Sequence, residues 1–183
     1  LRTIPLATLH NGEHHLIEDY SLGILPAFNL TDWSVSSVEQ ASFNSSAVLA
    51  MGSSEFESQP DLPAVDAELK MVVQGVDQSE FFLNEDFTLA NLRSQLQKKD
   101  YGIVHLATHA TFESGNLEDS YLQLWKEQLA LSKVDSLQLS DAELNLLVLS
   151  ACNTAMGDDT SEYGFAGFAV NAGVPSTLAS LWP

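Results

Sequence analysis

The sequence predicts an α/β fold in which a mostly parallel sheet is covered by helices on both faces. The short, continuously apolar run Ala47–Met51 and the mostly apolar run Ile103–Thr108 indicate strands buried on both faces, because strands with one wet face alternate apolar and polar residues. Stretches with apolar residues at helical spacing, such as Leu62–Gln74, separate these runs. Strands that alternate with helices form parallel sheets, since the helix returns the chain to the starting edge.

Each expected element has a local signal. Ser140 followed by Glu143 fits a capping box, and Thr160 or Ser161 is expected to cap the last helix, which Gly173 ends. In chain order, we expect a strand at 47–51, a helix at 62–74, a strand at 81–83, a helix at 89–96, a strand at 103–108, a hairpin formed by 121–125 and 128–131, a strand within 144–149, a helix through 164–170 and a strand at 176–181.

The first part of the chain carries a different signal. Asn11-Gly12 lies between two apolar runs, which predicts a two-residue hairpin in an N-terminal region at 1–33. Three histidines at 10, 14 and 15 flank this turn, but no cysteine or spaced carboxylate completes a metal site, so we expect solvated side chains. Residues 34–46 are polar and are typical of a connector. We expect one domain over 1–183, with its core at 47–183.

The charge balance limits the class of partner. Seven Lys and Arg face 25 Asp and Glu, giving a net charge of −18, which argues against nucleic acid and anionic membranes as partners. The same charge suits a cationic peptide, although keeping the protein soluble is its simplest role. One cysteine permits no internal disulfide, and no apolar run reaches the roughly 20 residues of a membrane helix. No signal-peptide core follows Leu1. We expect a cytoplasmic location, and we expect no metal or cofactor.

Function in parallel sheets gathers beyond the carboxyl ends of the strands. His109 follows one expected strand and Cys152, the only cysteine, follows the next, 43 residues later. A nearby imidazole can take the thiol proton and later protonate a leaving amine, and caspase-type enzymes separate the pair by roughly 50 residues. The backbone N–H groups of Ala110 and Cys152 are the expected oxyanion donors. His105 lies inside the strand and is expected to pack.

The residues alone leave other roles open for this cysteine. A lone Cys at a strand end is often a small buried hydrophobe, and an exposed one can act as a redox-sensing thiol.

Segments around both strand ends resemble those of a known family. Val104–Ala110 resembles the histidine motif of CHAT domains, which are bacterial caspase-like modules often fused to tetratricopeptide repeats, and Leu149–Ala155 resembles their cysteine motif. Segments that resemble the family's opening and closing parts lie at 5–9, 48–52, 164–167, 172–176 and 180–182.

The resemblance implies a caspase-like three-layer fold with inserted β-hairpins and a cysteine endopeptidase acting on a protein or peptide. His109 is then the general base and Cys152 the nucleophile. Ala110 stands where the family often has glycine, and Asn153 where it often has a charged residue. Family members usually continue beyond the Trp-Pro at 182–183, so the chain is expected to be a piece of a longer protein, with a core that is incomplete at its C-terminal end. The longer protein is expected to contain tetratricopeptide repeats outside this chain.

Substrate preference is indicated only by the resemblance. Several relatives in the wider clan cut after basic residues through an acidic pocket, which makes Glu55, Asp158 and Asp159 candidate pocket acids, with solvated loop carboxylates as the alternative. The alternative to a peptidase is a non-catalytic interaction or signalling module that keeps the fold without turnover.

Overall fold

The structure is a computed structural model that describes residues 6–22, 47–113, 116, 118–139, 142, 144–151, 169 and 172–180. The chain divides into two compact units, Leu1–Asp32 and Trp33–Pro183. The second unit holds the sheet and is described first. Among the described residues, no helix combines the length and apolar character needed to cross a bilayer.

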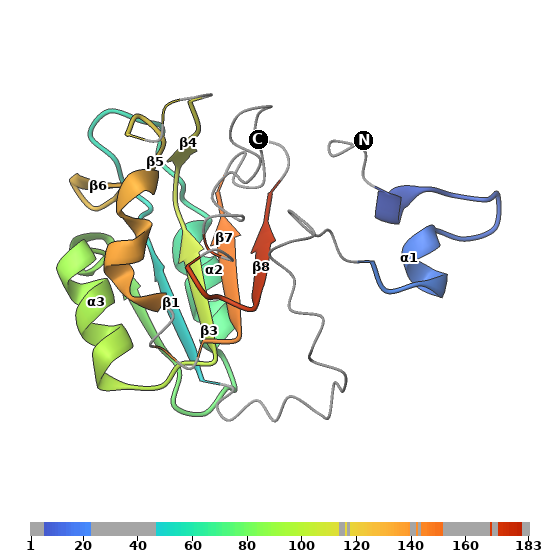
Figure 1. Ribbon diagram of the computed structural model, residues 1–183, viewed down its shortest axis with the longest axis horizontal. Coiled ribbons are helices and arrows are strands. Elements are labelled where there is room, and N and C mark those ends of the chain that lie inside the picture. Colours follow the sequence, from blue (N-terminus) through green and yellow to red (C-terminus); the bar gives the residue numbers. More distant parts are fainter. Residues whose placement is uncertain are drawn as a thin grey trace. The chain divides into compact units, whose positions relative to one another are not determined.

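Five parallel strands form the central sheet of the second unit (Figure 1). They are β1 (Val48–Gly52), β2 (Glu80–Leu83), β3 (Ile103–Ala107), β7 (Leu146–Ser150) and β8 (Ser176–Ala179), in the spatial order β2-β1-β3-β7-β8. Every neighbouring pair runs parallel. The predicted parallel sheet is therefore confirmed, and each strand lies within about two residues of its expected bounds.

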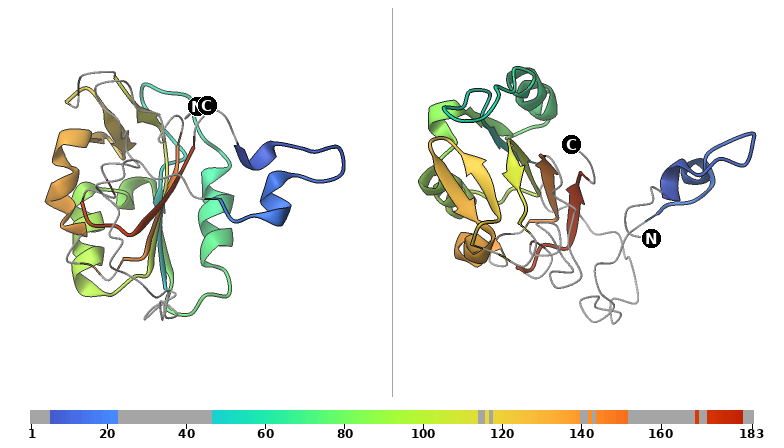
Figure 2. Two further views of the ribbon diagram at one scale, coloured as in Figure 1. Left: turned by 45° about the vertical axis from the view of Figure 1, so that its right-hand side comes forward. Right: turned by 90° about the horizontal axis from the view of Figure 1, so that it is seen from above.

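Helices cover both faces of this sheet (Figure 2). The helix α2 (Val65–Val73) lies on one face, and α3 (Leu89–Lys98) lies on the other with the 3₁₀ helix η4 (Leu131–Leu137). The side chain of Thr88 caps α3 by accepting a hydrogen bond from the Asn91 N–H at 3.1 Å. The predicted helices at 62–74 and 89–96 are thus confirmed. A short 3₁₀ turn, η3 (Asn84–Asp86), follows β2.

Alternating side chains assign the two faces of each strand to separate cores. On β1, Val48 and Ala50 pack with Val65 and Leu69 of α2, whereas Leu49 and its alternate neighbours pack against the α3 face. Leu49 and Leu69 are fully buried, and burial of such a leucine is worth roughly 1.5–3 kcal/mol. Because both faces of β1 pack in apolar surroundings, its sequence is continuously apolar, which explains the signal that predicted it.

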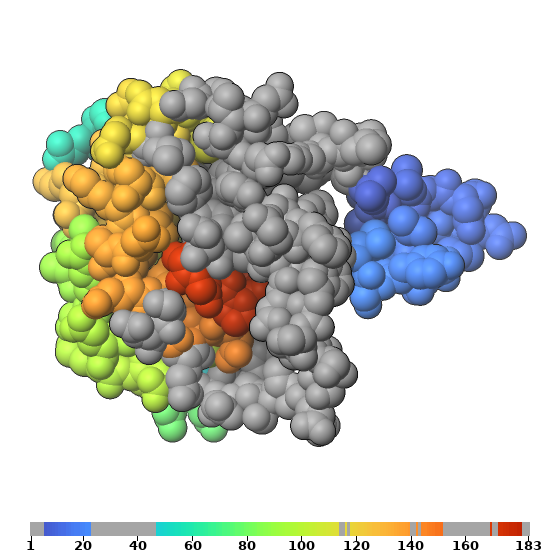
Figure 3. Space-filling model, in the orientation of Figure 1, coloured from blue at the N-terminus to red at the C-terminus, as the bar shows by residue number. Residues whose placement is uncertain are grey.

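A small antiparallel sheet follows β3. It consists of β4 (Ala110–Thr111), β5 (Tyr121–Leu124) and β6 (Glu127–Ala130), in that order. This confirms the inserted hairpin predicted from residues 121–131. The hairpin leads into η4, and η4 is tied to α3 because Arg93 Nη2 donates to Ser136 Oγ at 2.6 Å. Figure 3 shows α3 and η4 as neighbouring parts of one surface.

The structure does not test two of the predicted helix caps. Ser140 and Glu143, and likewise Thr160 and Ser161, lie outside them. Nevertheless, Ala169 is helical and Val174 N–H donates to its carbonyl at 3.1 Å, while Gly173 has φ +94°. A bond across five residues with a left-handed glycine is the Schellman ending of a helix, so the predicted role of Gly173 is confirmed.

In the first unit the chain reverses around Asn11-Gly12 as predicted, but the predicted two-residue length of the turn is wrong. Its described part contains the 3₁₀ helix η1 (Leu6–Thr8) and the short helix α1 (Leu16–Asp19), joined by one isolated antiparallel bridge between His10 and His15. The chain reverses over the four residues between them, because Asn11 Oδ1 accepts the N–H groups of Glu13 and His14. The side chain of Asn11 therefore sets a wider turn than the Asn-Gly pair predicts.

Candidate functional site

The carboxyl ends of three strands meet at one edge of the sheet. In the parallel register Gly52 of β1 is opposite Ala107 of β3, which in turn is opposite Ser150 of β7. In the order β2-β1-β3, the connection from β1 leads to β2 on one side of β1, and the connection from β2 leads back past β1 to β3 on its other side. Ligands in open α/β sheets bind at the carboxyl ends beside such a switch point. The topology therefore selects the edge at which His109 is located.

The backbone around His109 is held on both sides. Thr108 N–H donates to the Ser150 carbonyl at 3.2 Å, and the Thr108 hydroxyl donates to the Gln123 carbonyl. Gln123 N–H in turn donates to the His109 carbonyl at 2.9 Å. The histidine is thus attached to β7 through its preceding residue and to β5 through its own carbonyl.

A backbone carbonyl orients the half-buried imidazole of His109. Its Nε2 lies 2.7 Å from the Pro60 carbonyl oxygen. A carbonyl only accepts, so the hydrogen bond requires the proton on Nε2 in the neutral ring and leaves the lone pair on Nδ1. The Phe56 ring packs beside the imidazole with centroids 4.6 Å apart and planes at 59°. Together these contacts fix the orientation of the ring and leave Nδ1 as the nitrogen that can accept a proton.

The loop that carries Phe56 and Pro60 is fixed where it leaves β1. A Cβ on Gly52 would lie 2.4 Å from the Ala107 carbonyl oxygen, so only glycine fits this approach of β1 to β3. Ser53 N–H then donates to the same carbonyl at 3.2 Å. Further along, Ser54 N–H donates to Asn84 Oδ1 at 2.9 Å. The position of the Pro60 carbonyl therefore depends on bonds to β3 and to η3.

The backbone N–H of Ala110 is directed away from the hairpin. Ala110 is opposite Leu122 in the antiparallel pair, and the flanking bond from Gln123 N–H to the His109 carbonyl makes this pair a non-hydrogen-bonded one. In such a pair the N–H and C=O groups face away from the partner strand. The N–H of Ala110 therefore points to the side of β4 that does not contact β5, where no residue that the structure describes accepts it.

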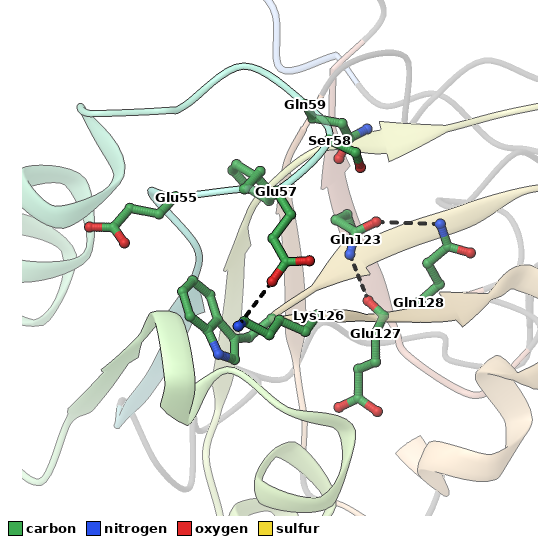
Figure 4. Close-up of a pocket in the computed structure, with 10 residues that line it drawn as sticks. Glu55, Glu57, Ser58, Gln59, Gln123, Lys126, Glu127 and Gln128 are labelled. Carbon is green, nitrogen blue, oxygen red and sulfur yellow. Dashed lines mark hydrogen bonds and ion pairs between the residues drawn. The ribbon is translucent and has the colours of Figure 1, made fainter.

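A groove of about 480 Å³ lies between the loop after β1 and the β5–β6 hairpin (Figure 4). Its lining residues are Glu55, Phe56, Glu57, Ser58, Gln59, Gln123, Trp125, Lys126, Glu127 and Gln128. Phe56 belongs both to this lining and to the contact with His109. The groove therefore lies next to the residue that supports the imidazole.

Not every predicted site residue falls within the described part of the chain. His109, Ala110 and Glu55 do, and Glu55 is exposed on the groove lining. Cys152, Asp158 and Asp159 lie outside the described residues. The role expected of His105 is confirmed, because it is buried and its Nε2 lies 2.8 Å from Glu68 Oε1 on α2.

Sequence reasoning missed the contacts that orient His109. A backbone carbonyl such as that of Pro60 leaves no side-chain signature, and Phe56 lies four residues beyond the end of β1, farther from its strand than His109 lies from the end of β3. The groove residues Trp125 and Lys126 could have been found, since they occupy the turn of a hairpin that was itself predicted next to the histidine.

Comparison with known proteins identifies the family. The model of the CHAT domain matches residues 1–183, the whole chain. A search of curated proteins gave no match. The five-stranded parallel sheet with helices on both faces and a small antiparallel sheet inserted after β3 is a caspase-like α/β arrangement. The chain therefore belongs to the CHAT domain family.

Proposed function

We propose that this chain is a cysteine endopeptidase-like domain that cleaves a protein partner through His109 and Cys152. The observation that carries the proposal is the parallel register of β3 and β7, in which Ala107 is opposite Ser150. His109 and Cys152 each follow these paired residues by two positions. Because adjacent strands lie about 4.8 Å apart, side chains that leave neighbouring strand ends at the same level can reach one another.

The contacts of His109 support its role as the base. With Nε2 bound to the Pro60 carbonyl, Nδ1 is the nitrogen that accepts the thiol proton of Cys152. The thiolate then forms a bond to the scissile carbonyl carbon, and the C–N bond breaks as the imidazolium protonates the leaving amine. Water, deprotonated by the same Nδ1, hydrolyses the thioester and restores the thiol.

The N–H of Ala110 supplies a donor for the negative charge that develops on the carbonyl oxygen. It belongs to the residue after the base and faces away from the β5 ladder. Removing one such donor usually lowers turnover by about 100-fold to 1,000-fold, which indicates how much this group is expected to contribute.

A peptidyl electrophile tests the proposal directly. The full chain, within its parent protein, is treated at neutral pH with a panel of peptidyl acyloxymethyl ketones and analysed by intact mass and peptide mapping. We expect one adduct, located on Cys152, and no adduct on the Cys152→Ala variant. Because the chain has a single cysteine, the position of the adduct is unambiguous. No adduct with any member of the panel would contradict the peptidase and would favour the non-catalytic interaction module.

A further inference from the structure

The turn at Asn11-Gly12 in the first unit brings together the groups that a cyclisation of asparagine requires. An asparagine followed by glycine can close a five-membered succinimide ring when the glycine backbone nitrogen attacks the side-chain amide carbon, and a residue without a side chain hinders this attack least. Gly12 has φ +107°, and a Cβ added to it would meet nothing within 4 Å, so its surroundings are open. The sequence contains one Asn-Gly pair, and it lies at this turn.

A base contacts the nitrogen that would attack. Gly12 N–H donates to His10 Nδ1 at 3.0 Å, so the neutral ring carries its proton on Nε2 and directs the lone pair of Nδ1 at the amide hydrogen. The His10 ring packs against that of His15, with centroids 4.6 Å apart and planes at 67°, and His15 Nδ1 donates to the Thr8 carbonyl at 3.1 Å. These contacts hold the His10 ring where it can take the proton of Gly12 during the attack.

The side-chain amide of Asn11 is polarised on its oxygen and faces an acid at its nitrogen. Asn11 Oδ1 accepts the N–H groups of Glu13 and His14 at 2.9 and 3.0 Å. Two donors on one carbonyl oxygen stabilise the negative charge that develops there when a nucleophile adds to the carbon. The leaving nitrogen, Asn11 Nδ2, lies 3.3 Å from His14 Nε2, which is also 2.6 Å from Asp19 Oδ2. When the His14 ring is protonated, it can give a proton to the departing nitrogen.

We propose that Asn11-Gly12 is a self-modifying site at which the chain converts its own asparagine into aspartate or isoaspartate. The Gly12 nitrogen forms a bond to the side-chain carbon of Asn11 while its proton passes to His10 Nδ1. The bond from that carbon to Nδ2 breaks, and ammonia leaves with a proton from the His14 ring. His10 then returns its proton to solvent, and His14 regains one. Water opens the succinimide at either carbonyl, so the whole conversion consumes one water and releases one ammonia.

The conversion changes the turn that holds the first unit together. Isoaspartate lengthens the backbone by one methylene group, at a turn that is spanned by the single antiparallel bridge between His10 and His15. Neither η1 nor α1 contains a buried residue, so no packed core compensates for a broken bridge in these elements. We therefore expect the Leu16 N–H, which donates to the Leu9 carbonyl at 2.8 Å, to exchange faster with solvent after modification. Unchanged exchange at Leu16 would refute this opening of the turn.

Ageing of the intact protein measures the reaction. The full chain is incubated at neutral pH, folded in buffer and unfolded in urea, and peptide mapping by mass spectrometry follows the gain of about 1 Da at Asn11 and separates aspartate from isoaspartate. We expect modification to be about tenfold faster or more in the folded chain, because the base and the two N–H donors are assembled only in the folded turn. A folded rate no higher than the rate in urea would overturn the proposal.

Matched variants separate the base from the shape of the turn. Asparagine carries an oxygen where histidine carries Nδ1, so His10→Asn keeps an acceptor for the Gly12 N–H but removes the base, and we expect the modification rate to fall about tenfold. Glu13→Gln changes a charge in the same turn and keeps the N–H that Asn11 accepts, so its rate should equal that of the parent. Equal rates for His10→Asn and the parent would refute the role of His10. These rates do not involve Cys152, so they are independent of the proposed peptidase.

Discussion

The interior of β3 and its carboxyl end each present a histidine, four residues apart, in opposite settings. His105 points into the packing between β3 and α2, is 7% exposed, and pairs with a carboxylate of α2. His109 lies past the last strand residue, is half-buried, and pairs with the Pro60 carbonyl of a loop. One residue type therefore serves packing inside the strand, whereas beyond its end the same residue type has the setting that the proposed chemistry requires.

Replacing each histidine separately is the strongest test of whether the two residues have different roles. His109→Ala is expected to slow labelling of Cys152 by about 100-fold or more, because no base remains to take the thiol proton, with little change in stability. His105→Ala is expected to leave labelling unchanged per folded molecule but to lower the free energy of unfolding by about 1–3 kcal/mol, since its buried hydrogen bond to Glu68 is lost.

Labelling rates and urea unfolding of both variants provide the measurement. Equal slowing of labelling by His105→Ala and His109→Ala would show that the two settings are not functionally distinct. A structural role for His109 would appear instead as a loss of stability that accounts for its lost labelling.

Gly52, the last residue of the neighbouring strand β1, lies opposite Ala107, where the interior of β3 ends and its carboxyl edge begins. In Gly52→Ala the new Cβ would meet both the Ala107 carbonyl and the Val65 side chain, and the backbone atom cannot be moved cheaply. We expect the free energy of unfolding to fall by about 2–3 kcal/mol and labelling of Cys152 to slow, because Ala107 precedes the segment that carries His109.

Gly75 offers the control for this substitution. A Cβ there meets nothing within 4 Å, although φ +76° makes any side chain strained. Gly75→Ala is therefore expected to cost about 1 kcal/mol from the backbone alone and to leave labelling unchanged. A Gly52→Ala protein as stable and as reactive as the parent would show that the β1–β3 contact does not position the site.

The interior of the molecule was more predictable from sequence than its edge. Strands β1, β3 and β7 were predicted because burial within the sheet favours mostly apolar runs, and their neighbouring ends were expected on that basis. The wider turn at Asn11 was not predicted, since a side-chain oxygen and a hairpin compete for the same residues.

The site shows the same division. His109 was found because a side chain at a strand end is visible in the sequence, whereas the Pro60 carbonyl that orients it is a backbone group 49 residues earlier and carries no signal. The Lys126–Trp125 contact depends on hairpin geometry that sequence spacing alone does not give.

Tyr101, just before the amino end of β3, offers a third side chain for comparison, and the expected effect of its replacement on stability is the smallest of those considered. Tyr101, 1% exposed, donates its hydroxyl proton to Glu80 Oε2 at 2.5 Å. Burial, followed by the hydrogen bond and the negative charge of Glu80, raises the pKa of this phenol well above its usual value near 10. Below pH 10 the phenol is protonated in both folded and unfolded chains, so its contribution to stability is fully present.

Above pH 10 the unfolded chain releases this proton first, and the free energy of unfolding should fall by up to about 1 kcal/mol per pH unit. Tyr101→Phe removes the ionisable group, so its stability should decline less steeply in this range. Tyr20→Phe, at a position 62% exposed, should follow the parent. Unfolding in urea between pH 9 and 11 measures the three slopes, and a Tyr101→Phe slope as steep as the parent's would place the cause elsewhere. Because this group lies at the opposite end of β3 from His109, the test separates the stability of the sheet from the reactivity of its carboxyl edge.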